Sequence, residues 1–499
     1  MLTLSSLKIL RAANPRVHVR QFVGQFCFVT ALSAVSAMGT GCMVGPNYQQ
    51  PAVEQPLDFK SQAASGEAPL MAREWWRLYG DADLDQLIED AHASNQTLRQ
   101  AVARIDEARA LARVAGSFLY PTISLDPRFL RERNSGNRDS TITGRRVQQG
   151  VTVNDWLIPF DLTYELDVWG RVRRSFESAR AQAAATADDA GLIRLTVETD
   201  VAQFYYSLRS LDAQLQILSD NVAAYREQVR LLSVQLKTGL ISAIVVNQAQ
   251  AQLQATLAQQ RDVERARANL EHALAILCGQ PAPSFAVAKN PLHESAPPAV
   301  PPGLPAQLLA RRPDVAAAEQ TVVALNAQIG VATAEFYPRF TLTSSAGFES
   351  ANLSTLFNWQ SRVAAISPSI SIPIFEGGRL RANLEATRAR YQQAVAAYVN
   401  QVLIAYGDVE DALTDLHALS DEVATLREAV SASQSYLRLA QVQYRQGLAD
   451  YLIVTDAERT LLANQLSLAQ AVNLQMGASI RLIKALGGGW DPAEDASPR

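Results

Sequence analysis

An internal duplication constrains the fold of this chain more than any other feature. Residues 170–279 and 378–487 align without gaps at a constant offset of 208. A second match, at offset 217, pairs residues 118–121 (Phe-Leu-Tyr-Pro) with 335–338 (Glu-Phe-Tyr-Pro). An offset held over so long a stretch indicates that the chain repeats one long structural unit. Identical pairs include Gly170/Gly378, Arg171/Arg379, Asp200/Asp408, Gln235/Gln443 and Gly239/Gly447.

Each copy contains a long stretch with helical periodicity. Spacings of three and four residues predict supercoiled helices that pack side by side. Gly239 and Gly447 are placed to end the first helix of each copy, and a second helix then runs to Gly279 or Gly487. A helix from about 171 to 237 would be roughly 100 Å long, far longer than a globular core needs. The apolar series of the first copy is Leu208, Leu211, Leu215, Leu218, Val222, Tyr225, Val229, Leu232 and Leu236.

Each copy also contains segments that alternate between apolar and polar residues. The clearest are 159–168 and 366–374, with weaker alternation near 123–129 and 340–348. They predict four strands in two hairpins, with polar loops at about 134–150 and 350–361, and with the length of tilted membrane-crossing strands. A soluble, half-buried sheet would show the same alternation. If the strands cross a membrane, the side chains expected to face lipid are those of Phe160, Leu162, Tyr164, Leu166, Ile370, Ile372 and Ile374. Those expected to line a lumen are Asp161, Glu165 and Asp167.

The amino-terminal residues have the layout of an export signal. Lys8, Arg11, Arg16 and Arg20 precede an uncharged, fairly apolar stretch that ends in Gly39-Thr-Gly-Cys42. Small residues before a cysteine resemble a bacterial lipoprotein cleavage site, so we expect a diacylglycerol and an acyl chain on Cys42. An ordinary signal peptide that happens to contain a cysteine is the alternative.

Composition and motifs exclude several functions. A net charge of −4 argues against nucleic acid as a partner. After position 45 no uncharged apolar run reaches about eighteen residues, which excludes a membrane protein built of helices. No HExxH, CxxC, GxSxG or Walker A pattern occurs, so the sequence predicts no enzyme, no metal site and no cofactor besides the lipid. Cys278, in an apolar helix end, is expected to be a buried structural thiol.

These features combine into one architecture. Four strands cannot close a membrane barrel, and open strand edges are not tolerated in lipid, so several chains must share one barrel. Both hairpins begin and end at helices, which places all helices on one side of the membrane. The expected fold is an α+β membrane protein with an internal tandem repeat. Its predicted segments are 1–41 (signal peptide), 42–117 (anchor, equatorial segment and first helix), 118–279 (first repeat, with a hairpin at about 118–169 and helices at about 170–279), 280–311 (Pro-rich equatorial linker), 312–487 (second repeat, with a helix at about 312–335, a hairpin at about 336–376 and helices at about 378–487) and 488–499 (tail).

Several motifs resemble the outer membrane factors of tripartite efflux systems, the TolC-like family, and most closely its NodT-like lipoprotein branch that serves RND pumps. The resemblance extends over nearly the whole mature chain. The motifs that carry it include 41–48 (Gly-Cys-Met-Val-Gly-Pro-Asn-Tyr), 75–84, 308–315 (Leu-Leu-Ala-Arg-Arg-Pro-Asp-Val), 317–319, Asn326, 329–331, 373–379 and 444–447. The resemblance implies a homotrimer with a twelve-stranded β-barrel in the outer membrane, continued by a long α-helical barrel in the periplasm. It further implies a periplasmic adaptor (membrane fusion protein), an inner-membrane RND pump, contact with outer membrane lipid, and export of drugs or small molecules.

The same resemblance points to a periplasmic gate. Residues 451–459 (Tyr-Leu-Ile-Val-Thr-Asp-Ala-Glu-Arg) are similar to the family's constriction motif, which puts Leu452 and Asp456 around the pore. We hypothesise in addition that Arg459 helps to hold the closed end through a salt bridge whose partner the sequence does not identify. The first copy has Ile244 and Gln248 at the matching positions, so only the second could supply a ring of carboxylates. A packed leucine and a helix-capping aspartate are the structural alternative. For the whole chain, the alternative function is a lipid-anchored periplasmic coiled-coil adaptor or scaffold without a membrane-spanning barrel.

Overall fold

The computed structural model describes residues 43–56, 58–60, 71–133, 135, 150, 152–292, 296–300 and 310–491. Among these residues, no helix combines the length and the hydropathy that crossing a bilayer requires. The elements run in the order η1 (Trp75–Tyr79), α2 (Ala82–Ser94), α3 (Gln96–Ser117), β1 (Thr122–Leu125), β2 (Arg128–Arg133), β3 (Thr152–Leu166), α4 (Arg171–Lys237), α5 (Ala243–Leu277), η2 (Ala282–Ser284), α7 (Pro313–Ala334), β4 (Arg339–Ser350), η3 (Leu353–Thr355), η4 (Trp359–Ser361), β5 (Arg362–Ser371), α8 (Arg379–Arg445) and α9 (Tyr451–Ala485).

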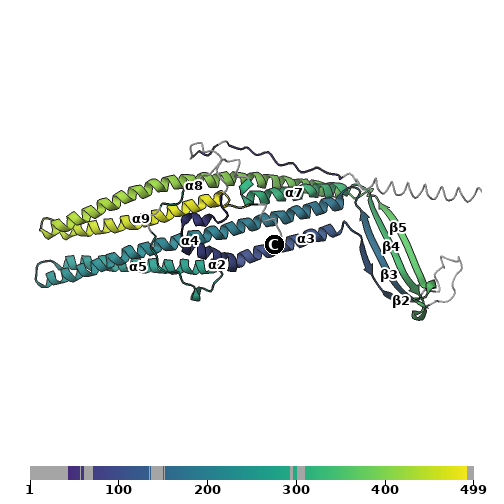
Figure 1. Cartoon of the computed structure of the whole chain (residues 1–499), viewed down its shortest axis with the longest axis horizontal. Helices are drawn as coiled ribbons and strands as arrows, with labels where there is room; N and C mark the ends of the chain where they lie inside the picture. The colour runs from purple at the N-terminus through teal and green to yellow at the C-terminus, as the bar shows by residue number, and fades with distance from the viewer. Residues whose placement is uncertain are drawn as a thin grey trace, which may run out of the picture. The chain divides into compact units, whose positions relative to one another are not determined.

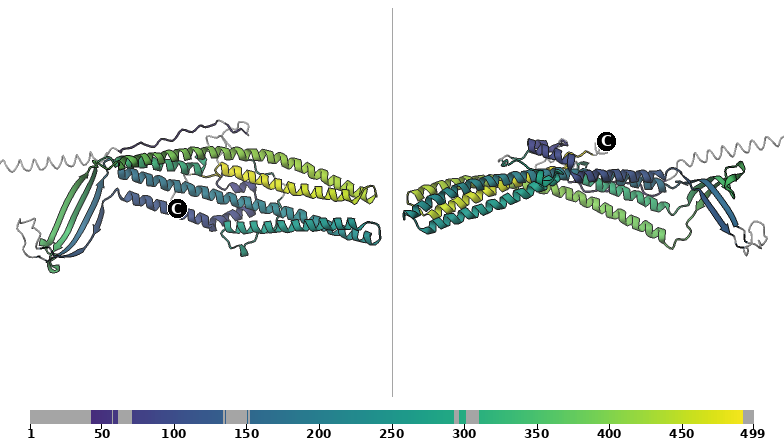
Figure 2. Two further views of the ribbon diagram at one scale, coloured as in Figure 1. Left: turned by 180° about the vertical axis from the view of Figure 1, so that it is seen from behind. Right: turned by 90° about the horizontal axis from the view of Figure 1, so that it is seen from below.

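The helices reproduce the duplication to the residue. The offset of 208 carries both ends of α4 onto those of α8, and both ends of α5 onto those of α9. The second offset, 217, carries both ends of α3 onto those of α7. Each copy of the repeat therefore supplies one short helix, one helix of 67 residues and one of 35. Figures 1 and 2 show α4 with α5, and α8 with α9, as two long helical hairpins.

The chain divides into two compact units that do not coincide with the two repeats. The first comprises residues 1–48, 112–179 and 324–391, and the second comprises 49–111, 180–323 and 392–499. Of the five boundaries, those at 179/180 and 391/392 fall inside the 67-residue helices, and those at 111/112 and 323/324 fall inside α3 and α7. Each unit thus takes material from both copies of the repeat.

The first unit contains one antiparallel sheet in the order β1–β3–β4–β5, with β2 also paired to β3. The predicted strands are present, but the first is interrupted at residues 126–127. Pro127 has no N–H to donate to the ladder, and the chain resumes pairing at Arg128 opposite Leu157. The central β3–β4 ladder joins the hairpin of one repeat to the hairpin of the other, as Figure 1 shows.

The last strand ends earlier than the sequence pattern predicts. Strand β5 ends at Ser371, so the placement of Ile372 and Ile374 on the lipid-facing side of a strand is wrong. Pro373 lies between them and cannot donate to a ladder, which accounts for the early end. Both isoleucines lie in the loop before α8 and are exposed.

The second unit is built around two kinds of core. In one, Trp75 of η1 and Ile88 of α2 pack with Tyr205 of α4, Leu274 of α5 and Ile480 of α9. In the other, the far ends of α4, α5, α8 and α9 pack together through residues that include Leu232, Val246, Ala440 and Val454. The packing of all four helices in one cluster agrees with the 3.5-residue periodicity of the sequence.

Cys278 lies in the first of these cores and is fully buried. Its thiol donates to the carbonyl oxygen of Leu87 at 3.6 Å. Burial, with a smaller contribution from Asp90, raises the pKa of the thiol to about 12. The cysteine is therefore protonated and inert at neutral pH, as the sequence predicts.

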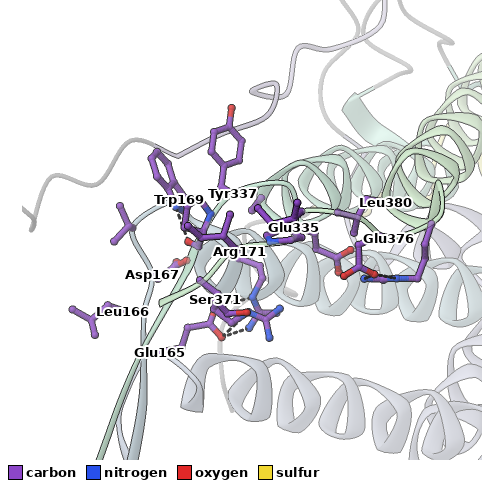
Figure 3. Close-up of a pocket in the computed structure, with 18 of the residues that line it drawn as sticks. Glu165, Leu166, Asp167, Trp169, Arg171, Glu335, Tyr337, Ser371, Glu376 and Leu380 are labelled. Atoms are coloured by element: carbon purple, nitrogen blue, oxygen red, sulfur yellow. Dashed lines mark hydrogen bonds and ion pairs between the residues drawn. The ribbon is translucent and has the colours of Figure 1, made fainter. Parts of the chain in front are cut away.

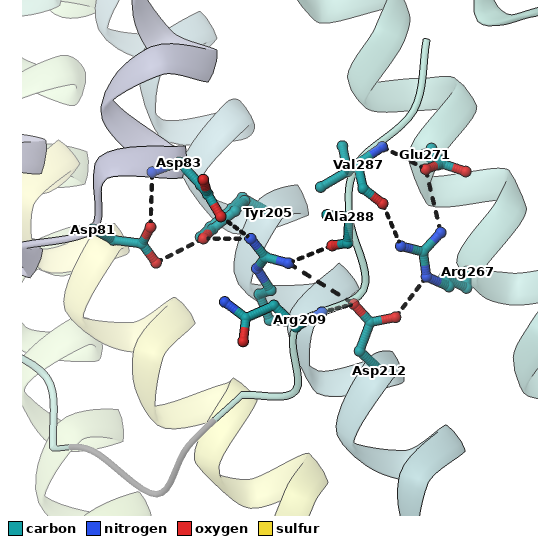
Figure 4. A network of polar contacts seen from close by, with 10 residues as sticks. Asp81, Asp83, Tyr205, Arg209, Asp212, Arg267, Glu271, Val287 and Ala288 are labelled. Carbon is teal, nitrogen blue, oxygen red and sulfur yellow. Dashed lines mark hydrogen bonds and ion pairs between the residues drawn. The ribbon is translucent and has the colours of Figure 1, made fainter.

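A buried ion pair fixes the start of the Pro-rich linker. The Arg267 guanidinium of α5 donates to the Asp212 carboxylate of α4 at 2.5 Å and to the carbonyl oxygen of Val287 at 2.8 Å (Figure 4). The other Asp212 oxygen accepts the backbone N–H of Asn290 at 3.0 Å. Because Asp212 and Arg267 are both buried, these contacts neutralise charges that would otherwise be costly to desolvate.

A second arginine extends the network toward α2. Arg209 of α4 donates to the carbonyl oxygen of Ala288 at 2.7 Å and to the Asp83 carboxylate at 2.6 Å. It also donates to the Tyr205 hydroxyl, which in turn donates to Asp81 at 2.7 Å (Figure 4). Residues 287–290 are therefore held through their backbone atoms, in addition to the packing of the Val287 side chain against the first core.

Candidate functional site

The register of the sheet gathers apolar side chains from every strand onto one face. Leu162 lies opposite Ile123 in β1 and Ser344 in β4, and Ser344 lies opposite Ile366 in β5. Successive side chains of a strand point to opposite faces, so residues two apart share this one. In the single chain much of the face is exposed, including Phe160, Ile366 and Ile370. The apolar face, so defined, consists of Ile123, Leu125, Phe129, Trp156, Ile158, Phe160, Leu162, Tyr164, Leu166, Phe340, Leu342, Ala346, Phe348, Ala364, Ile366 and Ile370.

The opposite face is polar over the same strands. Asp161, Thr163 and Glu165 of β3 pair with Ser345, Thr343 and Thr341 of β4, and β5 continues the rows with Ser367 and Ser369. The Thr341 and Ser369 hydroxyls lie 2.9 Å apart and form a hydrogen bond. The division into two faces agrees with the predicted positions of Phe160, Leu162, Tyr164, Leu166 and Ile370 on one side and of Asp161 and Glu165 on the other.

Aromatic residues concentrate toward both ends of the apolar face. At the hairpin tips, Phe129 stacks on Trp156 with ring centroids 4.3 Å apart, and Phe348 meets Phe357 edge-on at 5.5 Å. At the base, where strands give way to helices, Trp169 stacks on Tyr337 at 4.7 Å. Paired bands of aromatic rings around an apolar strip are typical of membrane-spanning sheets.

The base of the sheet is closed by charged side chains that pair with one another. Glu165 accepts two hydrogen bonds of 2.8 Å from Arg171, and Glu376 pairs with Arg379 at 3.0 Å. These residues line a cavity of about 670 Å³, shown in Figure 3. Since the carboxylates already have partners from the same chain, the cavity has the character of a structural junction rather than of a ligand site.

Asp167 lies at this junction and not in the strand. Strand β3 ends at Leu166, and the Asp167 carboxylate accepts the backbone N–H groups of Val172 and Arg173 at 3.1 and 2.8 Å. It therefore satisfies the first N–H groups of α4. The prediction that Asp167 lines the lumen is wrong, because an apolar–polar alternation does not reveal where a strand stops and a helix begins.

Cys42 lies outside the described residues, but the segment that follows it is firmly held. The Val44 N–H donates to the Trp169 carbonyl oxygen at 3.1 Å, and Asn326 donates to the Pro46 carbonyl oxygen at 3.1 Å. Gly45, at φ +92°, passes so close to Gly330 that a Cβ on Gly45 would lie 2.5 Å from the Gly330 Cα. The chain just after Cys42 is thus fixed beside the end of β3.

The proposed gate residues lie at the turn between α8 and α9. Leu452, in the first turn of α9, is 64% exposed, and Leu448 in the turn itself is 74% exposed. Their counterparts in the first copy, Ile244 and Leu240, are each 74% exposed. Both helical hairpins therefore end in apolar side chains that the single chain leaves uncovered, so Leu452 is not the packed core leucine of the structural alternative.

Asp456 lies one turn farther along α9, on the same helix face as Leu452. Its carboxylate accepts a hydrogen bond from the Tyr436 hydroxyl of α8 at 3.2 Å, a contact that the sequence did not reveal. Desolvation and this hydrogen bond raise the pKa of Tyr436. Asp456 therefore links α9 to α8, and it does not cap a helix.

Arg459 is exposed, and no residue of the described chain forms a salt bridge with it. Its predicted salt bridge thus has no partner among the described residues of the same chain. No group of His, Cys, Asp and Glu residues in the described ranges is arranged to bind a metal ion.

Comparison with known proteins identifies the family. The model of the outer membrane efflux protein family matches residues 87–280 and 304–488. The cation efflux system protein CusC of Escherichia coli is 32% identical over 93% of this chain and 98% of its own length. The solvent efflux pump outer membrane protein SrpC of Pseudomonas putida is 33% identical over 91% and 97%.

Solved structures show the same fold. The outer-membrane channel OprN has a TM-score of 0.83 at 29% identity, covering 90% of this chain and 100% of that one. The MtrE outer membrane channel of Neisseria gonorrhoeae has a TM-score of 0.77 at 28% identity, covering 90% and 98%. These relatives are channels of efflux systems and not isolated periplasmic scaffolds. The chain belongs to the outer membrane efflux protein family and is accordingly an efflux channel of the outer membrane, the duct of a tripartite pump rather than an enzyme.

Proposed function

We propose that three copies of this chain form one continuous exit duct, with a shared twelve-stranded barrel in the outer membrane and a helical barrel in the periplasm. The observation that carries the proposal is the single apolar face that runs across the whole sheet between two unpaired edges. Within the described chain, β1 and β2 pair only with β3, and β5 pairs only with β4. Edges of this kind are not tolerated in lipid, so neighbouring copies must close them.

The dimensions of the sheet support a membrane-spanning role. Ten residues separate Trp156 at the tip from Leu166 at the base, which at about 3.4 Å each corresponds to roughly 34 Å of strand. With a tilt of about 40°, such a strand rises roughly 26 Å along the membrane normal, close to the apolar height of known barrels. The polar face would then line the lumen.

The anchor and the gate complete the proposal. A lipidated Cys42 would enter the inner leaflet beside the base of the sheet, where Val44 is bound to Trp169. At the other end of the duct, Leu452 and Asp456 from three chains would form two stacked rings that narrow the periplasmic entrance. The exposure of Leu452 in the single chain supports a contact with other copies.

The partners and cargo follow from the family. We propose that the duct works with a periplasmic adaptor and an inner-membrane RND pump. CusC is named for cation efflux and SrpC for solvent efflux. By analogy, the cargo of this chain is a class of small toxic molecules chosen by the pump.

The test is the behaviour of the protein in outer membrane fractions. We expect an SDS-resistant trimer that migrates differently when heated, and stepwise conductance when the purified protein is added to planar bilayers. A monomeric protein without conductance would contradict the proposal. Co-purification of the adaptor and pump identifies the cargo class, because it reveals which transporter the duct serves.

A further inference from the structure

A carboxyl group occupies a core position of α9 close to the gate. The buried stripe of the first turns of α9 runs through Tyr451, Val454, Thr455, Glu458 and Leu462. Glu458 is 8% exposed and occupies a position at which the helical periodicity predicts an apolar residue. The equivalent position in the first copy is Gln250, which is exposed, so only the gate-bearing copy has this feature.

The hydrogen-bond partner of Glu458 is an uncharged side chain. Gln228 of α4 donates to its carboxyl oxygen at 3.1 Å. In the described chain, no basic side chain forms an ion pair with it. Desolvation, offset in part by the Gln228 hydrogen bond, raises the pKa of Glu458 to about 7. A buried carboxyl without a cation is stable chiefly in its neutral form.

The groups around Glu458 from the neighbouring helices are mostly uncharged. Tyr225 of α4 and Tyr451 of α9 both have a pKa raised by burial and, to a smaller extent, by the Glu458 charge. From α5, Gln252 lies beside Tyr225, and from α8, Tyr444 packs edge-on against Tyr451 at 5.5 Å. The charge of Arg459 acts on Tyr225, but the Arg459 side chain is itself exposed.

We propose that Glu458 is a positioning residue of the gate, a proton-dependent latch that holds α9 against α4 when its carboxyl is neutral and loosens that contact when it ionises. The inference rests on the proposed function, in which the α8–α9 turn forms the periplasmic gate. Leu452 and Asp456 precede Glu458 on the same helix, six and two residues away, so a shift of α9 relative to α4 moves both of them.

The direction of the effect follows from linkage. The pKa is higher when Glu458 is buried than when it is exposed to water, where its ordinary value is 4.5. The proton on Glu458 therefore stabilises the buried, closed arrangement fully below about pH 4.5, and this stabilisation is lost as the pH rises through about 7. If opening exposes the carboxyl, the ratio of open to closed gates should rise about tenfold per chain between about pH 6 and about pH 8.

Single-channel recording of the trimer at these two pH values tests the latch. We expect the wild type to open more at the higher pH and Glu458→Gln to remain closed at both. Glu422→Gln, which removes an exposed carboxylate from α8, should keep the wild-type response. Gln228→Leu should shift the response to higher pH, because it removes the hydrogen bond that lowers the Glu458 pKa. The Gln228→Leu variant keeps the test valid even if Glu458→Gln does not assemble.

Two results with variant channels would overturn the latch. One is a Glu458→Gln channel with the wild-type pH response, and the other is a response that disappears in Asp456→Asn instead. A wild-type channel that conducts but does not respond to pH also refutes the latch and leaves the proposed function intact. The absence of any conductance at either pH would instead refute the proposed function.

Discussion

At the scale of single residues, proline and glycine decide where the sheet can form. Pro159 lies in the middle of β3 and faces Gly347 of β4. A Cβ on Gly347 would lie 2.0 Å from the Ile158 carbonyl oxygen and 2.9 Å from the Pro159 Cα. The backbones thus approach so closely that only glycine fits, which explains how a ladder continues past a residue that cannot donate a hydrogen bond.

The two faces of β3 make a prediction for adjacent residues. Leu162 belongs to the apolar face and Thr163 to the polar face. Leu162→Arg should cost about 2–4 kcal/mol if the side chain faces mid-membrane lipid, whereas Thr163→Arg should be tolerated in a wet lumen. The measurement is the urea concentration at which the barrel loses heat-modifiable migration in outer membranes. Equal losses for both substitutions would contradict the assignment of the faces.

At the scale of elements, the helices were predictable and the ends of the strands were not. The gap-free offset and the glycines after each helix locate α4 and α8 to the residue. The break at Pro127 and the early end of β5 depend on single prolines inside otherwise regular alternation. The contacts of Asp212 with Arg267 and with Asn290 join residues 55 and 78 positions apart, and no local pattern reveals them.

The surroundings of the candidate gate residues were likewise not predictable from the sequence. A local motif predicts Leu452 and Asp456 as gate residues, but it does not predict what surrounds them. Tyr436 contacts Asp456 across two helices, and Glu458 is distinguished only by its burial. The one sequence signal for Glu458 was a carboxylate at a core position of the periodic pattern, seven residues after Tyr451 and four before Leu462.

The linker network predicts a large effect from a small substitution. Asp212→Asn should destabilise the second unit by roughly 1–3 kcal/mol, because it removes the most deeply buried counter-ion of Arg267 and leaves only Glu271, 3.2 Å away. The measurement is the midpoint of thermal unfolding, together with the rate of proteolysis near residues 287–290. Replacing both partners, as Asp212→Leu with Arg267→Met, should restore much of the stability. A double substitution as damaging as the single one would show that the pair itself is not the cause.

At the scale of the whole molecule, the proposed barrel and the proposed lipid would be two separate attachments to the membrane. Cys42→Ser should abolish lipidation, yet the trimer should remain in the outer membrane because a closed barrel buries far more apolar surface than one lipid group. Fractionation of cells followed by the heat-modifiability assay checks this outcome. A soluble periplasmic protein would show instead that the lipid, and not the sheet, holds the chain.

The proposed gate is the feature in which the three chains of the proposed trimer would act together, and it gives the last prediction. Leu452 is largely exposed and Asp456 contacts only Tyr436 in the described chain, so truncating both should cost a single chain little stability. In the trimer, Leu452→Ala with Asp456→Ala removes two rings at once and should widen the closed end. We expect a larger single-channel conductance in planar bilayers and increased sensitivity of cells to vancomycin. The matched control is Ile244→Ala with Gln248→Ala, the equivalent positions of the first copy, which removes an exposed apolar residue without removing a carboxylate. If the Leu452/Asp456 double variant is well expressed and trimeric but conducts like the wild type, these residues do not form the gate, and the narrowing of the duct must lie elsewhere.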